Sequence, residues 1–358
     1  MHTIPVELQQ NGYPIYCGMG ILPSFGRILQ EHRPIKQAAI ITQKNIDSLY
    51  GEILRKSLSN CELLTITVPD GEQAKSPEEL HNLYTRLLEH RFERSSVIIA
   101  LGGGVVGDLA GYAAATYLRG VDLVQVPTTL LAQVDSSIGG KTGINHPLGK
   151  NLIGAFKQPL FVYADTSTLQ TLPDEEIRCG LGEVIKYGFI LNEKLFAYLE
   201  KNLEKALDKD PAVLEHLARV SAQEKARVVA QDEKESNLRM ILNYGHTFGH
   251  ALEAELHFSG IKHGEAVILG MQCALEYQRL AGTIADEDCR RGMALLKRVL
   301  ISFPREQLNP DLLVEHMSLD KKVKDKNIRL ILLEKIGRYA IEQSADINLL
   351  KEAFKIVQ

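Results

Sequence analysis

The sequence predicts an α/β domain with a doubly wound, mainly parallel sheet, followed by a mainly α-helical domain. In the first half, short continuously apolar stretches alternate with helical patterns, as in a parallel sheet that helices cover on both faces. From Leu169 to Ser318 almost only helical periodicity remains. A chain of 358 residues has room for about two domains. We therefore expect a nucleotide-binding-like domain over residues 1–165 and a second domain over residues 166–358.

The elements of the first half follow one another in strict alternation. The helix expected at Pro77–Arg91 carries leucines at positions 80, 83, 87 and 88, which fall on one face. Strands are expected at Ala38–Thr42, Leu63–Val68, Val97–Leu101 and Leu123–Val126, and the other helices at Asn45–Leu58 and Val105–Leu118.

The second half opens its helices with recognisable signals. Asp210 followed by Pro211 is typical of an N-cap with proline at the first helical position, and predicts a helix to about residue 230. Further helical pieces are expected at Leu252–Leu256 and Val267–Leu280, and two late strands, Ile328–Leu333 and Arg338–Glu342, are expected to pair as a hairpin.

Composition and charge exclude several classes of protein. The formal net charge is −4, which gives no basic footprint for nucleic acid or an anionic membrane. The five cysteines are scattered without a Cys-x-x-Cys pair, so we expect free thiols in a reducing, cytoplasmic setting. The N-terminus lacks the pattern of a signal peptide, and Asp108 and glycines interrupt the most apolar stretch, so no membrane partner is expected.

A glycine-rich turn follows the predicted strand Val97–Leu101. Gly102–Gly107 fits the pattern G-x-G-x-x-G and opens a predicted helix. Glycines let the backbone approach a phosphate, and a helix N-terminus offers free N–H groups and the positive end of a dipole. The turn follows about the third strand rather than the first, so we expect a pyrophosphate site of non-standard topology.

A histidine cluster indicates a metal centre. His246 and His250 are four residues apart and share a helix face, and His263 follows after a break. Two histidines at this spacing can bind one metal ion, or one can bind it while the other moves protons. A carboxylate ligand is also needed, and local spacing leaves Glu183, Glu253 and Glu265 as candidates.

A third group of residues has the character of an anion pocket. Lys141 and Lys150 lie where glycines bring backbone and cation together, as phosphate and carboxylate sites require. The whole group comprises Arg119, Asp135, Lys141, Asn145, Lys150, Asn151, Lys186, Lys225, Arg239 and Asn243. We also expect Arg239, Asn243 and His246 to share one stripe if the histidine helix extends back that far.

Taken together, these motifs resemble the 3-dehydroquinate synthase family, in the family's order and across nearly the whole chain. The matching stretches are Pro69–Lys75, Gly102–Asp108, Pro127–Ser137, Gly139–Thr142, Gly149–Gly154, Gly182–Gly188, Leu242–His250 and His263–Val267. The sequence departs from the family pattern in two places. Gln43 stands where Asp or Asn usually meets the adenosine ribose, and residues 323–327 lack the usual glycine.

The resemblance implies a dehydroquinate synthase-like fold, NAD and one divalent ion, zinc or cobalt, and assigns residues to each. NAD would be held by Glu72, Lys75, Gly103, Gly104, Val105, Asp108, Thr128, Thr129, Asp135, Lys141 and Lys150. The metal ligands would be Glu183, His246 and His263. The substrate would meet Arg119, Asp135, Lys141, Asn151, Lys186, Lys225, Arg239, Asn243 and His250. Of these, His250, Lys141, Lys186, Arg239 and Asn243 would be catalytic, and Lys321 or Lys322 would enter the site.

The resemblance also implies a reaction, the second step of the shikimate pathway. NAD would oxidise carbon 5 of 3-deoxy-D-arabino-heptulosonate 7-phosphate, phosphate would leave, and the returned hydride, ring opening and an aldol closure would give 3-dehydroquinate. The partner is thus a small sugar phosphate, and a homodimer is one candidate assembly. Three alternatives stay open: another sugar phosphate cyclase, a polyol dehydrogenase of the glycerol dehydrogenase type, and an inactive NAD-binding regulator.

Overall fold

The computed structural model describes residues 1–59, 61–235, 238–257, 260–320 and 328–358. Two compact units make up the chain, Met1–Leu172 with Leu214–Lys234, and Pro173–Val213 with Glu235–Gln358. The segment Leu214–Lys234 thus joins the first unit, although the sequence prediction grouped it with the second. Lys321, Lys322 and the loop at 323–327 lie outside the described residues.

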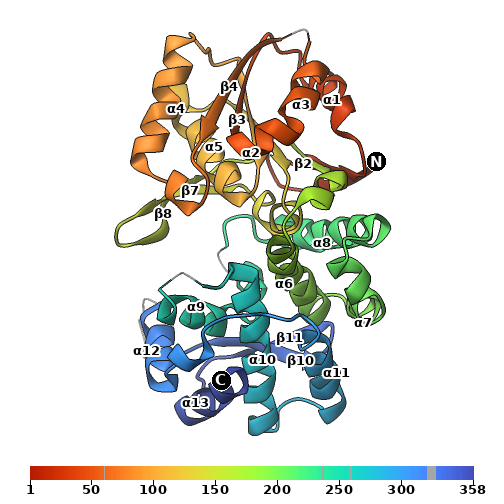
Figure 1. The fold of residues 1–358 in the computed structure, drawn as a ribbon, viewed down its shortest axis with the longest axis vertical. Coiled ribbons are helices and arrows are strands. Elements are labelled where there is room, and N and C mark those ends of the chain that lie inside the picture. Colours follow the sequence, from red (N-terminus) through yellow and green to blue (C-terminus); the bar gives the residue numbers. More distant parts are fainter. Residues whose placement is uncertain (60, 236–237, 258–259, 321–327) are drawn as a thin grey trace. The chain divides into compact units, whose positions relative to one another are not determined.

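The first unit is built on a seven-stranded sheet in the order β1-β2-β9-β6-β5-β3-β4 (Figure 1). All its pairings are parallel except β1 with β2. The strands are β1 (His2–Val6), β2 (Tyr13–Gly18), β3 (Gln37–Gln43), β4 (Glu62–Val68), β5 (Val97–Gly102), β6 (Asp122–Pro127) and β9 (Phe161–Asp165). The four strands expected from apolar runs are present, so the parallel α/β prediction is confirmed.

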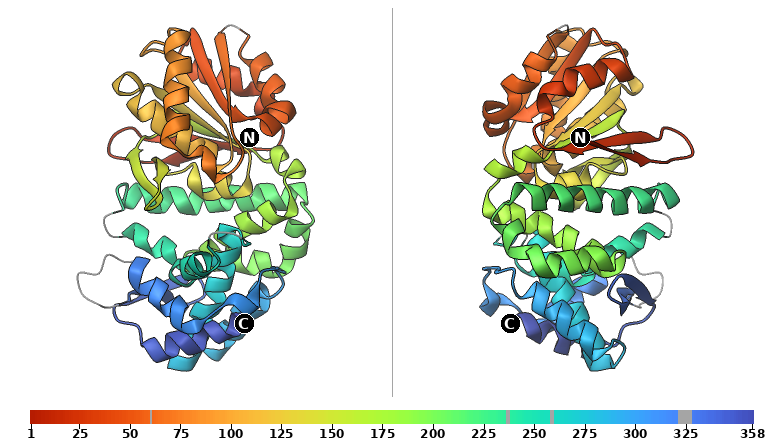
Figure 2. Two further views of the ribbon diagram at one scale, coloured as in Figure 1. Left: turned by 60° about the vertical axis from the view of Figure 1, so that its left-hand side comes forward. Right: turned by 90° about the vertical axis from the view of Figure 1, so that its right-hand side faces the viewer.

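Helices cover both faces of this sheet (Figure 2). The cause is visible in β3, where Ala38 and Ile40 pack on one side while Ala39 and Ile41 pack on the other. One core includes α1 (Phe25–His32) and α3 (Glu52–Ser57), and the other includes α4 (Pro77–Glu89) and α5 (Gly104–Thr116). The helix expected at Asn45–Leu58 is divided into α2 (Lys44–Ile46), a π-helical turn at Asp47–Gly51, and α3.

A two-stranded hairpin stands beside α5. It consists of β7 (Lys141–His146) and β8 (Gly149–Phe156), paired antiparallel. Gly111 permits the contact with α5, because a Cβ there would lie 2.3 Å from Cγ2 of Thr142. The hairpin was not expected from the sequence, because its glycines and polar residues interrupt the alternation by which strands are recognised. It carries Lys141, Lys150 and Asn151 on one short ribbon.

The second unit is mainly helical, as predicted. Its helices are α6 (Asp174–Ile190), α7 (Glu193–Leu207), α9 (His246–Glu255), α10 (His263–Ala281), α11 (Asp286–Leu296), α12 (Pro310–Asp320) and α13 (Ile347–Phe354). The expected late hairpin is present as β10 (Leu330–Lys335) with β11 (Arg338–Glu342). The helix expected from Pro211 is α8 (Pro211–Gln231), most of which belongs to the first unit.

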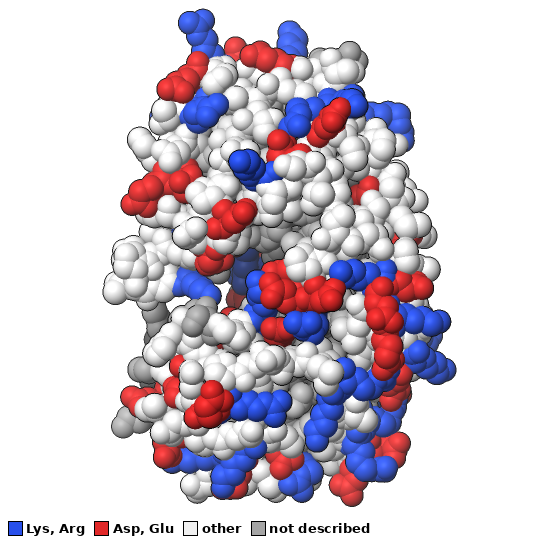
Figure 3. All heavy atoms as spheres, viewed as in Figure 1, with Lys and Arg blue, Asp and Glu red and all other residues white. Residues whose placement is uncertain are grey.

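Charged side chains of both signs are interspersed over the face shown in Figure 3. Among the described residues, none of the helices has the length and apolar character needed to span a membrane.

Glycines set the close approach of α6, α9 and α10. A Cβ on Gly264 would lie 1.8 Å from the carbonyl oxygen of Cys179 in α6, and one on Gly182 would lie 2.3 Å from the carbonyl oxygen of Gly264. A Cβ on Gly270 of α10 would lie 2.0 Å from the carbonyl oxygen of Gly245, just before α9. The backbones therefore touch at the crossings, where ordinary side chains would hold helix axes about 8–10 Å apart.

We predict that Gly264→Ala lowers the free energy of unfolding by about 3 kcal/mol, because the new methyl group meets backbone that cannot rotate away. The matched variant is Gly282→Ala at the end of the same helix, where φ is +66° and no atom lies within 4 Å of the added carbon. Only backbone strain opposes that change, so we expect a loss of about 1 kcal/mol. Urea unfolding measures both, and an equal loss in the two variants would contradict the packing argument.

Candidate metal centre and anion site

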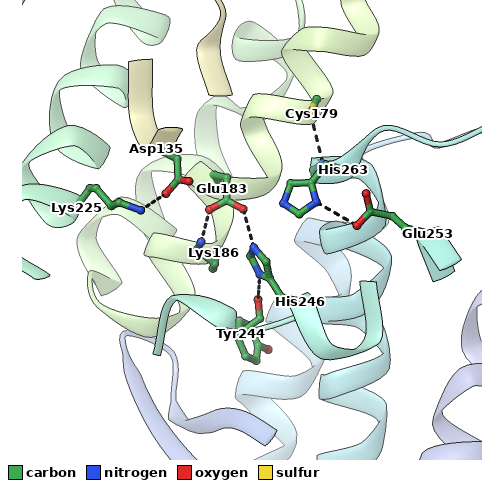
Figure 4. Close-up of polar contacts among 10 residues, drawn as sticks. Asp135, Cys179, Glu183, Lys186, Lys225, Tyr244, His246, Glu253 and His263 are labelled. Carbon is green, nitrogen blue, oxygen red and sulfur yellow. Dashed lines mark hydrogen bonds and ion pairs between the residues drawn. The ribbon is translucent and has the colours of Figure 1, made fainter. Parts of the chain in front are cut away.

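Three helices of the second unit bring a carboxylate and two histidines together (Figure 4). Glu183 comes from the buried middle of α6, His246 from the first residue of α9 and His263 from the first residue of α10. The left-handed backbone of Gly245, at φ +77°, starts α9 at His246. One potential ligand atom from each residue lies within 4.8 Å of the others.

The two histidines are oriented so that Nε2 is the nitrogen left for a ligand. His246 Nδ1 donates to the carbonyl oxygen of Tyr244 at 3.2 Å, and His263 Nδ1 donates to Glu253 Oε2 at 3.1 Å. Because both acceptors take a proton at Nδ1, the neutral ring presents a bare Nε2. His246 Nε2 lies 3.3 Å from Glu183 Oε1. The same arrangement orients metal-bound histidines generally.

The pKa values of His246 and His263 are shifted in opposite directions. Burial, assisted by the charge of Lys186, lowers the pKa of His246 to about 4, so this ring is neutral near pH 7. Burial also acts to lower the pKa of His263, but the hydrogen bond and charge of Glu253 outweigh it, and the pKa is raised. Lys186 is itself buried and donates to Glu183 Oε2.

This donor set fits a divalent ion. Two imidazoles and one carboxylate are the three protein ligands of many catalytic zinc sites, and an ion would replace any proton on Nε2. Of the three carboxylates left open by sequence spacing, Glu265 is engaged elsewhere, because it accepts from Arg178 Nε at 2.7 Å and from the Lys262 backbone N–H at 3.2 Å. Glu183 belongs to the group with both His246 and His263, whereas Glu253 groups with His250 and His263.

The ring of His250 lies beside the rings of His246 and His263, but His250 does not belong to the group formed by Glu183, His246 and His263. Its centroid lies 5.5 Å from that of His246 and 5.8 Å from that of His263. The stripe expected to join Arg239, Asn243 and His246 is absent from the structure. Arg239 and Asn243 lie on a 3-10 turn, Leu238–Asn243, and Gly245 separates that turn from α9. Arg239 is buried and Asn243 is exposed.

In the first unit, the glycine-rich turn meets the end of the neighbouring strand. Gly103 is the N-cap of α5, Gly104 and Val105 begin it, and Asp108 follows one turn later. Thr128 donates its backbone N–H to the carbonyl of Gly102 at 3.0 Å. A Cβ on Gly103 would lie 3.0 Å from Cγ2 of Thr129, so a larger residue there would press on this threonine.

Lys75 ties this helix to the hairpin. Its Nζ donates to Asp108 Oδ2 at 2.7 Å and to Asn151 Oδ1, and it lies 3.3 Å from Glu72 Oε1. Burial raises the pKa of Asp108, and the charge of Lys75 partly offsets this effect. Asn145 completes the network: its Nδ2 donates to Glu72 at 2.9 Å and its Oδ1 accepts from the Asn151 backbone N–H at 2.9 Å.

The other residues of the first unit that were predicted to bind anions lie outside the Lys75 network. Lys225 of α8 donates to Asp135 at 2.6 Å, while Lys141 and Lys150 are exposed on the hairpin. Arg119 follows α5 and precedes the start of β6. It therefore lies near the amino ends of the parallel strands, whereas the glycine-rich turn lies at their carboxyl ends. Its role stays a prediction. Gln43 donates its side chain to the carbonyl of Pro69 at 3.2 Å.

Sequence reasoning did not assign the roles of Glu253 and Asn145 in these networks. Glu253 was a candidate ligand only, although positions 246, 250 and 253 follow the i, i+4, i+7 spacing of one helix face. That spacing could have placed it beside the histidines. Asn145 carried no comparable signal, because its two partners are brought to it by the hairpin and by a loop distant in sequence.

Comparison with known proteins identifies the family to which the chain belongs. The model of the 3-dehydroquinate synthase N-terminal region matches residues 65–179, and that of the C-terminal region matches residues 180–323. The 3-dehydroquinate synthase of Methylococcus capsulatus is 46% identical over 352 residues, 98% of each chain. That of Nitrosospira multiformis is 48% identical over 358 residues, again 98% of each chain.

Among solved structures, 2-deoxy-scyllo-inosose synthase complexed with carbaglucose-6-phosphate, NAD+ and Co2+ has a TM-score of 0.89 at 27% identity, covering 99% of this chain and 100% of that one. This likeness confirms the predicted fold class, and the family models and relatives confirm the resemblance inferred from the motifs. The chain belongs to the 3-dehydroquinate synthase family.

Proposed function

We propose that this chain converts 3-deoxy-D-arabino-heptulosonate 7-phosphate to 3-dehydroquinate and inorganic phosphate, with NAD and one divalent ion as cofactors. The observation that carries the proposal is the convergence of Glu183, His246 and His263 in a chain of this family. The relatives named 3-dehydroquinate synthase match over nearly their full length. The NAD+ and Co2+ of the similar cyclase structure support the choice of cofactors.

The proposed cofactors supply chemistry that side chains lack. When bound, NAD supplies a reversible hydride acceptor and the divalent ion a Lewis acid, zinc and cobalt being the two candidates. Glu183, His246 and His263 would hold the ion. The turn at Gly103, Gly104 and Val105 would meet the pyrophosphate of NAD with backbone N–H groups at the start of α5.

The chain's own residues would do the rest of the work. Lys186 and Arg239 are buried cations of the second unit and would balance the charge of an anionic substrate. His250, beside the two proposed ligands, would move protons. In the first unit, Lys141, Lys150, Asn151, Lys225 and Asp135 would contribute further polar contacts, and Glu72, Lys75, Asp108, Thr128 and Thr129 would hold NAD.

Two finer proposals concern setting and assembly. All five cysteines are free thiols, which supports a cytoplasmic location.

We also propose a homodimer, supported by β1 forming the terminal strand of the seven-stranded sheet, since a sheet edge offers unpaired backbone groups to a partner. Sedimentation velocity measures the assembly directly, and a monomer at micromolar concentration would contradict it.

We predict that Glu183→Ala or His246→Ala abolishes binding of the ion, because each variant lacks one of the three proposed metal ligands. His250→Ala is the matched variant, one helical turn from His246. It should keep the ion and slow turnover about 10²–10⁴-fold, the usual contribution of a general acid or base. Metal content after dialysis and steady-state rates measure the two effects. Loss of the ion in His250→Ala would show that the histidine roles are divided differently.

We predict that inorganic phosphate is released in proportion to substrate consumed, that a trace of NAD supports many turnovers, and that a chelator stops the reaction. The hydride returns to the same substrate molecule, so NADH does not accumulate. The chain has no tryptophan, so the fluorescence of bound NADH can be followed in single turnovers with little interference. NADH accumulating without phosphate release would instead indicate a polyol dehydrogenase.

We predict that Asn145→Ala raises the KM for the phosphate substrate several-fold and speeds amide exchange at residues 149–151, because the Asn151 N–H loses its acceptor. The control is Asn82→Ala, which removes an exposed amide–carboxylate contact with Glu79 on α4 of the same unit. Hydrogen exchange and steady-state kinetics measure both variants. Unchanged exchange at 149–151 would contradict a positioning role for Asn145.

A further inference from the structure

Helix α9 carries two glutamates that each hold a histidine of another helix. Glu253 Oε2 accepts from His263 Nδ1 of α10 at 3.1 Å, and Glu255 Oε2 accepts from His316 Nε2 of α12 at 3.0 Å. The side chains of both glutamates are 9% exposed, and those of the two histidines are 35% and 32% exposed. The pairs are thus nearly identical in burial and distance, but only the first joins a proposed metal ligand.

His263 depends on Glu253 for its orientation more than His246 depends on its own partner. His246 donates to a backbone carbonyl only two residues away, so its ring is held by its own segment. His263 is the first residue of α10, and its Nδ1 partner comes from the last turn of a different helix. The Glu253 hydrogen bond therefore fixes both the ring and the tautomer of His263 across two helices (Figure 4).

The geometry also separates the role of Glu253 from that of a ligand. The two nitrogens of an imidazole point to opposite sides of the ring, so the Glu253 oxygen on Nδ1 lies away from an ion bound at Nε2. Glu183 instead approaches Nε2 of His246 at 3.3 Å. A carboxylate on the far nitrogen also makes the ring a stronger donor to a metal.

We propose that Glu253 is a positioning residue that acts through His263: it fixes the Nε2 tautomer and strengthens metal binding without touching the ion. This rests on the proposed metal site. Loss of such a partner usually weakens metal binding by roughly 10–100-fold.

The test is zinc titration of the metal-free full-length chain, by competition with a chromophoric chelator. Glu253→Gln keeps the volume and loses the charge, so we expect zinc affinity to fall roughly 10–100-fold with the stoichiometry unchanged. Glu253→Asp keeps the charge but withdraws it from Nδ1, and should lie between the wild type and the glutamine variant. Glu255→Gln, the matched control, should bind zinc like the wild type.

Cobalt supplies a second readout that does not depend on turnover. The visible bands of bound Co2+ respond to ligand orientation, so they should shift in Glu253→Gln and stay unchanged in Glu255→Gln. Thermal unfolding of the metal-free variants separates loss of binding from loss of folding. If Glu253→Gln does not fold, Glu253→Asp carries the same comparison.

Three outcomes overturn the proposal in distinguishable ways. Zinc affinity unchanged in Glu253→Gln but lost in His263→Ala would leave the metal site intact and remove the role of Glu253. Zinc binding lost as completely in Glu253→Gln as in Glu183→Ala would make Glu253 a ligand. Zinc binding unaffected by His263→Ala would mean that the proposed metal site itself is wrong.

Discussion

The contact of backbone against backbone at Gly182 and Gly264 is the constraint on which the second unit depends. Glutamate and histidine side chains are short relative to the usual distance between helix axes, so donor atoms on separate helices meet only where the helices approach closely. The crossing of α6 and α10 places Glu183 and His263, each next to one of these glycines, at that point. The crossing of α9 and α10, permitted by Gly270, brings His246 to the same place.

Burying the charged groups of Glu183 and Lys186 in this cluster costs free energy. Glu183 and Lys186 are each 1% exposed, and two such charges lose most of their hydration when buried. Their mutual contact offsets that cost, but an apolar pair of the same volume would stabilise the unit as well or better. The stability of the helices therefore does not account for their presence.

The sequence predicted the parallel sheet and the histidine pair because both are local patterns. Val97–Leu101 is apolar without interruption, and His246 and His250 are one turn apart. It could not predict that Arg239 is separated from α9, because that depends on Gly245 adopting φ +77°. Nor could it tell which of Glu183, Glu253 and Glu265 lies beside both His246 and His263, since that depends on the crossing of α6 with α10. The hairpin at Lys141–Phe156 was missed because Gly143 and Gly154, which lie against the backbone of the partner strand, interrupt the alternation by which strands are recognised.

In the first unit, the ammonium group of Lys75 is surrounded by acceptors. An ammonium group has three N–H bonds, and Glu72, Asp108 and Asn151 provide three acceptors around it. A ligand that accepts from this nitrogen must therefore displace one of them. Asp108 lies on α5 beside the glycine-rich turn, whereas Asn151 lies on the hairpin, so the displaced acceptor decides which element is released. Lys75 thus connects the helix that follows the glycine-rich turn to the hairpin, through its hydrogen bonds to Asp108 and Asn151.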